Sequence, residues 1–262
     1  NAQTRRVLTL LEARYNDFDG LNLTWETLEG VVKHNGPLSD PVSEDVADYV
    51  ARHDLEIGSY AGAEAQVAAL SDDIAYNNHD LDDGLRAGLF AIEDLAGLPM
   101  VGEIFSDTGT EYPKIARSRL IHEAVRRLIG VMVEDCLGES RARLARAAPE
   151  NAAQLRALGA PVISFSKEMS QIDGALKEFL FRNMYRHYKV TEMTANARRV
   201  VTELFTILFT RPAELPEEWR ALAGAPESVE TARAVGDYVA GMTDRFAMLE
   251  HARLTGSQAP LP

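Results

Sequence analysis

Apolar residues recur at helical spacing along almost the whole chain. Residues 117–147, 166–188 and 229–254 each carry an apolar stripe of the kind that one face of a helix buries. In the first of these segments the stripe consists of Leu120, Ile121, Ala124, Leu128 and Met132. No stretch of any length shows the strict alternation that a half-buried strand requires. The pattern therefore predicts an all-α fold.

Shorter helices are expected in the first third of the chain. Apolar spacing predicts a helix over residues 4–18, and Thr24 is the expected N-cap of a helix that runs to His34. Leu23 and Leu28 stand where a hydrophobic staple would pack across that cap. Ser43 is the expected cap of a further short helix, and residues 64–78 form the central helix. Residues 84–112 are Gly-rich and less regular, with a short helical piece around residues 92–95.

In the carboxy-terminal third, the pattern predicts a helix over residues 194–209, followed by a short helix that begins at Pro216 and contains Trp219. The apolar pattern ends near Thr255, so residues 255–262 are expected to form a disordered tail.

Composition narrows the class of protein. The chain has 262 residues, 46% of them hydrophobic and 26% charged, which is typical of a globular protein in water. It contains no apolar run of the ~18 residues that a membrane span needs, and no signal peptide, so we expect a cytoplasmic protein with no membrane partner. The single cysteine, Cys136, excludes an internal disulfide and is expected to be buried. The net charge of −13 argues against nucleic acid as a partner, because like charges repel.

One acidic stretch, residues 70–84, concentrates groups that can bind a ligand. Asp72, Tyr76 and Asp80 follow each other at four-residue spacing and so share one face of a helix. Ile74, Leu81 and Leu85 form a second, apolar face. A carboxylate can hold a divalent metal ion, and a phenol can pack against a sugar. A solvated acidic face is the alternative interpretation.

A basic segment, residues 177–189, is the second candidate. Lys177 and Tyr185 lie eight residues apart on one helix face, and Arg186 follows directly. Lys and Arg side chains hold phosphate groups through charge-assisted hydrogen bonds. The alternative is an amphipathic helix whose basic side chains extend into water. Lys33 and His34 are a weaker candidate, because a histidine near a helix carboxy end is often only a favourable partner for the helix dipole.

These stretches resemble a known family. The run Ser71-Asp72-Asp73-Ile74-Ala75-Tyr76, followed by His79-Asp80-Leu81-Asp82-Asp83-Gly84, resembles the last motif of the HD-domain deoxynucleoside triphosphate triphosphohydrolases, which include the bacterial dGTPase-like proteins. Further matching segments occur in the family's order at residues 1–4, 21–30, 33–37, 185–187 and 237–246.

The resemblance implies an HD-domain-like multi-helix bundle with a helical carboxy-terminal extension, divided into residues 1–90 and 91–254. It implies hydrolysis of a deoxynucleoside triphosphate to deoxynucleoside and inorganic triphosphate. In that reaction Asp72 would be a ligand of a divalent metal ion such as Mg²⁺ or Mn²⁺, with Asp73 as the alternative. Substrate contacts would come from Tyr76, Asp80, Lys177, Tyr185 and Arg186.

The same resemblance implies that part of the metal site is missing from this chain. The family's paired His-Asp motif comes far upstream of the later Asp, and neither His53-Asp54 nor His79-Asp80 fits that position. We therefore expect the remaining ligands and the general acid upstream of Asn1, with the chain a carboxy-terminal part of a longer enzyme. The family usually forms homo-oligomers, and apolar residues such as Trp219 and those of residues 238–249 offer surface for that contact.

Two other classes of function remain open. One is a nucleotide-sensing or structural protein with the same fold but no catalysis. The other is an all-α interaction module that binds no nucleotide, which only the composition supports.

Overall fold

The computed structural model describes residues 2–39 and 42–256. Every regular element among these residues is helical, with no strand, so the all-α prediction is confirmed for the described part of the chain. The chain forms two compact units, Asn1–Met184 and Tyr185–Pro262. The predicted boundary near residue 90 lies inside the first unit. In the described ranges, no helix combines the length and apolarity that a membrane span needs.

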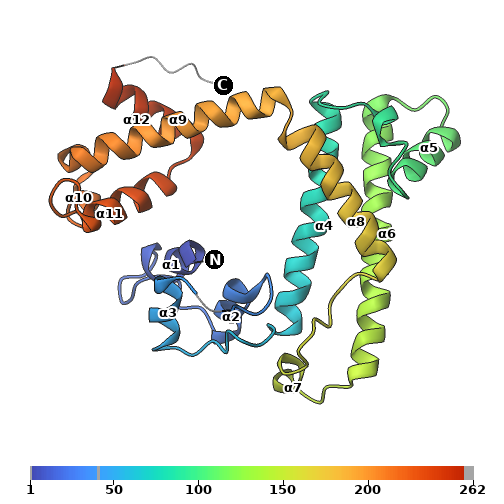
Figure 1. The fold of residues 1–262 in the computed structure, drawn as a ribbon, viewed down its shortest axis with the longest axis horizontal. Helices are drawn as coiled ribbons and strands as arrows, with labels where there is room; N and C mark the ends of the chain where they lie inside the picture. Colours follow the sequence, from blue (N-terminus) through green and yellow to red (C-terminus); the bar gives the residue numbers. More distant parts are fainter. Residues whose placement is uncertain (1, 40–41, 257–262) are drawn as a thin grey trace. The chain divides into compact units, whose positions relative to one another are not determined.

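Three long helices form the centre of the first unit. Helix α4 (Ala63–Arg86) packs against α6 (Arg117–Ala147) and α8 (Lys167–Leu180) (Figure 1). Helix α6 has the bounds that its apolar stripe predicted, and four of the five stripe residues are buried: Ile121, Ala124, Leu128 and Met132. Ser166 caps α8, because its Oγ accepts a hydrogen bond from the backbone N–H of Met169 at 3.1 Å.

A layer of shorter helices precedes α4. It comprises α1 (Ala2–Arg6), α2 (Trp25–Lys33) and α3 (Glu44–Val50), around a small core of Leu28, Val32, Val46 and Leu55. The predicted cap is confirmed: the Oγ1 of Thr24 accepts from the backbone N–H of Thr27 at 3.4 Å. Ser43 is the residue before α3 as predicted, but its side chain makes no cap hydrogen bond.

The predicted helix over residues 4–18 is wrong in its second half. After α1 a π-helical turn, Val7–Leu11, ends the helical run. The chain then folds back, since the N–H of Gly20 bonds to the carbonyl of Glu12 and that of Leu21 to the carbonyl of Leu8, both at 2.9 Å. Gly20 has a φ of +71°, and a Cβ there would lie 2.6 Å from the Leu8 oxygen. Only glycine permits this close return of the chain.

Four further predictions need correction. Helix α4 continues to Arg86 instead of ending near residue 78, and α5 (Val101–Glu111) lies in the segment expected to be irregular, after the predicted short turn at Ile92–Leu95. The segment 229–254 forms two helices, α11 (Val229–Ala240) and α12 (Asp244–Thr255). Cys136 is half-buried, because the apolar residues around it, Val133 and Leu137, lie on the exposed side of α6.

The second unit packs α9 (Tyr188–Thr210) against α11 and α12. A short helix, α10 (Glu217–Arg220), closes a core of Leu208, Leu215, Val235 and Tyr238. The ring of Trp219 lies 5.6 Å from that of Tyr238, between centroids. Trp219, expected at an oligomer interface for want of local partners, therefore packs within its own unit.

The expected disordered tail begins at Thr255, which is the last residue of α12. Residues 257–262 of that tail lie outside the described residues. A short helix, α7 (Ala152–Arg156), lies between α6 and α8.

Candidate functional site

Helix α4 carries the predicted ligand face. Asp72 and Tyr76 are exposed, and Asp80 is half-buried, at successive four-residue steps of one continuous helix. The opposite face holds Ile74, Leu81 and Leu85, which are 5%, 0% and 0% exposed. The two faces predicted from spacing are therefore both present, and burial of the apolar face orients the polar one outward.

A cavity of about 500 Å³ opens beside the amino-terminal half of this face. Asp72 and Asp73 line one side of it, and the end of α2 with the following turn, residues 33–37, lines another. The structure thus brings together two of the motifs singled out in the sequence. Tyr76 and Asp80 are not among the residues that line the cavity; they continue the same helix face beyond it.

Lys33 stabilises one wall of the cavity. Its side chain is fully buried, and its Nζ lies 2.7 Å from the Oε1 of Glu29. The same Nζ donates to the carbonyls of Glu56 and Tyr60 and to the hydroxyl of Ser59, at 3.1–3.3 Å. With every donor of the ammonium engaged, Lys33 holds the turn in place and is not a free phosphate ligand.

Glu29 is the acceptor shared by two cations. Arg156 of α7 donates to both of its oxygens, at 2.7 and 2.8 Å, beside the bond from Lys33. Burial disfavours the charged carboxylate, but the hydrogen bonds from Arg156 and Lys33 outweigh it and lower the pKa of Glu29. The pair joins α7 to α2.

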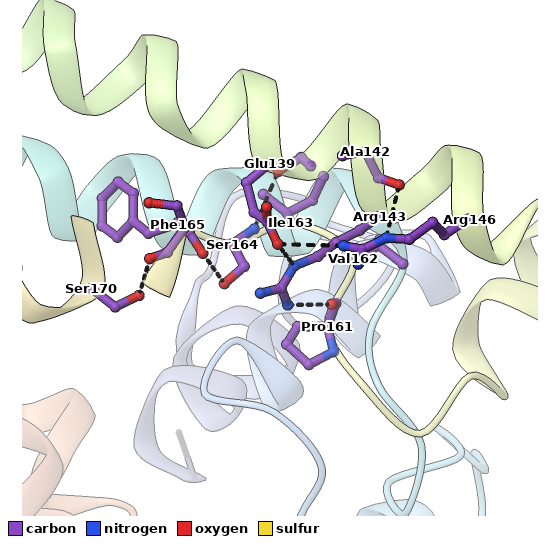
Figure 2. A network of polar contacts seen from close by, with 12 residues as sticks. Glu139, Ala142, Arg143, Arg146, Pro161, Val162, Ile163, Ser164, Phe165 and Ser170 are labelled. Carbon is purple, nitrogen blue, oxygen red and sulfur yellow. Dashed lines mark hydrogen bonds and ion pairs between the residues drawn. The ribbon is translucent and has the colours of Figure 1, made fainter. Parts of the chain in front are cut away.

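The segment between α7 and α8 forms the third wall, through Pro161 and Ile163. Gln66 of α4 accepts from the backbone N–H groups of Val162 and Ile163, at 2.9 and 3.2 Å. Figure 2 shows Arg143 of α6 reaching the carbonyl of Pro161, at 3.2 Å, while Glu139 holds the same guanidinium at 2.7 Å. The wall is therefore hydrogen-bonded to α4 and to α6.

Lys177 lies on α8 next to the acidic face of α4. Its Nζ is 2.9 Å from the Oδ2 of Asp173, on its own helix, and 3.3 Å from the Oδ2 of Asp73. Burial lowers the pKa of the ammonium, but the two carboxylates outweigh burial and raise the pKa of Lys177 overall. The structure thus brings Lys177 to the residue that adjoins Asp72.

Tyr185 and Arg186 are the remaining predicted substrate contacts. Tyr185 is the last residue of a π-helical turn, Phe181–Tyr185, and Arg186 is exposed just after it. Both belong to the second unit. Their role as nucleotide contacts stays a prediction.

The metal site predicted at Asp72 is incomplete in the described residues. No group of three or more His, Cys, Asp or Glu side chains that could hold a metal ion occurs in residues 2–39 and 42–256. A lone carboxylate leaves most positions around a divalent ion to water. The described residues therefore do not fit a metal centre by themselves, although Asp72 has the donor chemistry and exposure of one ligand.

Two residues that organise the site were missed in the sequence. Asn77 and Asp173 are both buried, and the Nδ2 of Asn77 donates to the Oδ1 of Asp173 at 2.9 Å. The spacing of Asp173 and Lys177, an acid four residues before a lysine on one helix, was a readable signal for that ion pair. No local pattern links Asn77 to α8.

Comparison with known proteins identifies the class. Residues 163–253 match the family described as the phosphohydrolase-associated domain. A protein of Parvibaculum lavamentivorans named deoxyguanosinetriphosphate triphosphohydrolase-like is 55% identical over 260 residues, 97% of this chain and 66% of the relative. A protein of the same name from Cereibacter sphaeroides is 49% identical over 257 residues, 98% of this chain and 68% of the relative.

The class is therefore that of the phosphohydrolases. Within it, the chain belongs to the family of deoxyguanosinetriphosphate triphosphohydrolase-like proteins. The chain spans about two thirds of the length of the curated relatives it matches.

Proposed function

We propose that the protein hydrolyses deoxynucleoside triphosphates to deoxynucleoside and inorganic triphosphate. The observation that carries this proposal is the cavity in which Asp72 and Asp73 face the turn 33–37, with Lys177 paired to Asp73. It lies in a chain whose relatives are named deoxyguanosinetriphosphate triphosphohydrolase-like.

The order of side chains along α4 suits an extended nucleotide. Four residues of helix rise roughly 6 Å. Asp72, Tyr76 and Asp80 can therefore contact successive parts of a molecule bound along the helix. Lys177 neutralises phosphate oxygens near Asp73. Tyr76 packs against C2′ of the deoxyribose, and Asp80 accepts a hydrogen bond from a sugar hydroxyl.

The family resemblance makes Tyr185 and Arg186, by themselves, two further proposed substrate contacts. Tyr185 caps the sugar or base, and Arg186 adds a cation for the phosphates. Asp72 would supply one oxygen ligand to a divalent ion such as Mg²⁺ or Mn²⁺, and the other ligands would come from outside the described residues. Such an ion, when bound, would lower the pKa of a bound water and polarise a phosphoryl oxygen.

A nucleotide-sensing protein without catalysis is the second candidate. The lack of a three-residue metal cluster in the described part of the chain favours it. Such a protein would bind deoxynucleotides and release nothing.

The test measures inorganic triphosphate released from each of the four dNTPs and four rNTPs by the complete protein, with Mg²⁺ or Mn²⁺ present. Release from dNTPs supports the enzyme. Thermal stabilisation by dNTPs without release supports the sensing protein, and neither effect would reject both. The 262-residue chain alone should release little triphosphate, because its described residues do not complete a metal centre.

We also propose that the protein acts as a homo-oligomer. Phe246 and Leu249 of α12 are 44% and 55% exposed, more apolar surface than solvent favours on one short helix. Light scattering at micromolar concentration tests this, and a strictly monomeric mass with and without dNTP would refute it.

A further inference from the structure

Four side chains form one continuous line of polar contacts between α4 and α8. Asn77 donates to Asp173 at 2.9 Å, Asp173 binds the ammonium of Lys177 at 2.9 Å, and that ammonium lies 3.3 Å from Asp73. We propose that Asp73 competes with anionic ligands for Lys177, and that Asp173, held by Asn77, is the positioning residue that keeps the ammonium at the site. The inference deepens the proposed function, on which the choice of a triphosphate as the anion rests.

The two carboxylates that share Lys177 differ in burial. The side chain of Asp173 is 11% exposed, whereas that of Asp73 is 58% exposed. Water screens an exposed ion pair and contributes competing hydrogen bonds, so such a pair contributes little to stability. The other oxygen of Asp173 accepts a hydrogen bond from Asn77, and this bond fixes the orientation of the Asp173 carboxylate. An incoming anion therefore displaces Asp73 and leaves the contact between Asp173 and Lys177 intact.

The negative charges around Lys177 are the reason that Asp73 affects anion binding. Lys177 carries one positive charge between two carboxylates, and Asp72 adds a further negative charge at the cavity. A triphosphate group brings about four more negative charges. Because the raised pKa of Lys177 keeps it protonated at neutral pH, its availability depends on which anion it contacts and not on its protonation. Asp73 thus weakens anion binding until the ligand takes its place.

Binding of inorganic triphosphate to the 262-residue chain, measured by calorimetry at low ionic strength, tests the competition. Asp73→Ala should bind triphosphate about two- to fivefold more tightly than the unaltered chain, the range expected from an exposed ion pair. The matched control is Asp82→Ala, which removes a carboxylate from the same helix where it pairs with Arg86 instead. The control should show less than half of that gain. In a Lys177→Ala background, Asp73→Ala should give no gain.

The positioning role of Asp173 is tested by a substitution that should weaken triphosphate binding, whereas Asp73→Ala should strengthen it. Asp173→Asn keeps an oxygen for Asn77 but removes the charge that holds Lys177. Simple electrostatics predicts tighter anion binding when a carboxylate is lost, whereas loss of positioning predicts weaker binding. We expect triphosphate to bind about two- to fivefold more weakly, with thermal melting used to confirm folding.

Three results would overturn the inference. They are an equal gain from Asp73→Ala and Asp82→Ala, tighter binding by Asp173→Asn, and no triphosphate binding by any of these chains. If the binding changes appear as expected while the complete protein releases no triphosphate from dNTPs, only the proposed function fails.

Discussion

Arg156 donates a bidentate pair of hydrogen bonds to the carboxylate of Glu29, from Nε to Oε1 at 2.7 Å and from Nη2 to Oε2 at 2.8 Å. The two residues are 127 positions apart, and the ring of Trp25 covers the guanidinium at 4.9 Å. A two-point Arg–carboxylate contact fixes orientation as well as distance. This pair therefore sets how α7 meets α2, the helix whose carboxy end lines the candidate cavity.

Removal of the charge on Glu29 should destabilise the protein strongly. Glu29→Gln leaves the fully buried ammonium of Lys33 without its anion, and loss of one partner of a buried pair costs about 3–5 kcal/mol. The control, Glu26→Gln, removes an exposed carboxylate from the same helix and should change the free energy of unfolding by less than about 0.5 kcal/mol. Urea denaturation measures both. Equal changes in the free energy of unfolding for the two variants would show that the buried Glu29–Lys33 pair makes no specific contribution to stability.

The same carboxylate should make stability depend on pH on the acid side. The pKa of Glu29 is lowered from its ordinary value of 4.5 despite burial, because Arg156 and Lys33 donate hydrogen bonds to it. The unfolded chain then binds this proton at higher pH than the folded chain, so the contribution is complete above pH 4.5 and is lost as pH falls towards the folded pKa.

The difference in melting temperature between the unaltered chain and Glu29→Gln should therefore narrow as pH falls below 4.5. Thermal melts from about pH 7 to about pH 3 measure it. A difference that stays constant or widens in acid would contradict the assignment.

Local pattern was sufficient for some elements and not for others. The bounds of α6 followed from an apolar stripe sustained over its whole length, and Thr24 marked the start of α2. Helix α5 was missed because glycines interrupt its short stripe and the residue before it, Met100, has a φ of +63°. The return of the chain at Gly20 depends on contacts that no helical period encodes.

Gly84 should not tolerate a side chain. A Cβ there would lie 2.3 Å from the ring of Phe90, which is buried and packs edge-to-face on Phe179. Because the ring cannot move freely, Gly84→Ala should destabilise by about 1–3 kcal/mol. Gly130→Ala is the matched control, since Gly130 is exposed within α6 with nothing near its Cβ position. It should stabilise by about 0.4–1 kcal/mol. Effects of the same sign would refute the packing argument.

The candidate site, like the fold, could be predicted from local sequence pattern only in part. The face of Asp72, Tyr76 and Asp80 could be read from four-residue spacing, because one helix carries all three. The surroundings of this face could not be predicted in that way, because the walls of the cavity come from segments far apart in the sequence. The pairing of Lys177 with Asp73 joins residues 104 positions apart, and the contact of Asn77 with Asp173 joins residues 96 positions apart.

Asp72 should be needed for catalysis and not for folding. As a proposed metal ligand, its loss in Asp72→Ala should lower triphosphate release by the complete protein about 100-fold or more, since changes outside the ligand shell alone cost about 10- to 100-fold. Because Asp72 is exposed, the free energy of unfolding without metal should change by less than about 0.5 kcal/mol. Asp82→Ala is the control and should retain activity. Full activity in Asp72→Ala would move the assignment to Asp73.

Tyr76 should set the preference for deoxyribose over ribose. The residue is 57% exposed on the ligand face of α4, one turn beyond Asp72, where we propose that its ring packs against C2′. A ring in that position leaves no room for a 2′-hydroxyl, and such shape-based rejection of a single hydroxyl is worth at most about 100-fold. Tyr76→Ala should therefore lower the ratio of kcat/KM for dNTP over rNTP by about 10- to 100-fold, chiefly by admitting the ribonucleotide. Tyr76→Phe keeps the ring and removes only the phenol hydroxyl, so it should retain the preference. If Tyr76→Phe loses the preference as fully as Tyr76→Ala, the discrimination comes from a hydrogen bond of the phenol and not from the packing of its ring.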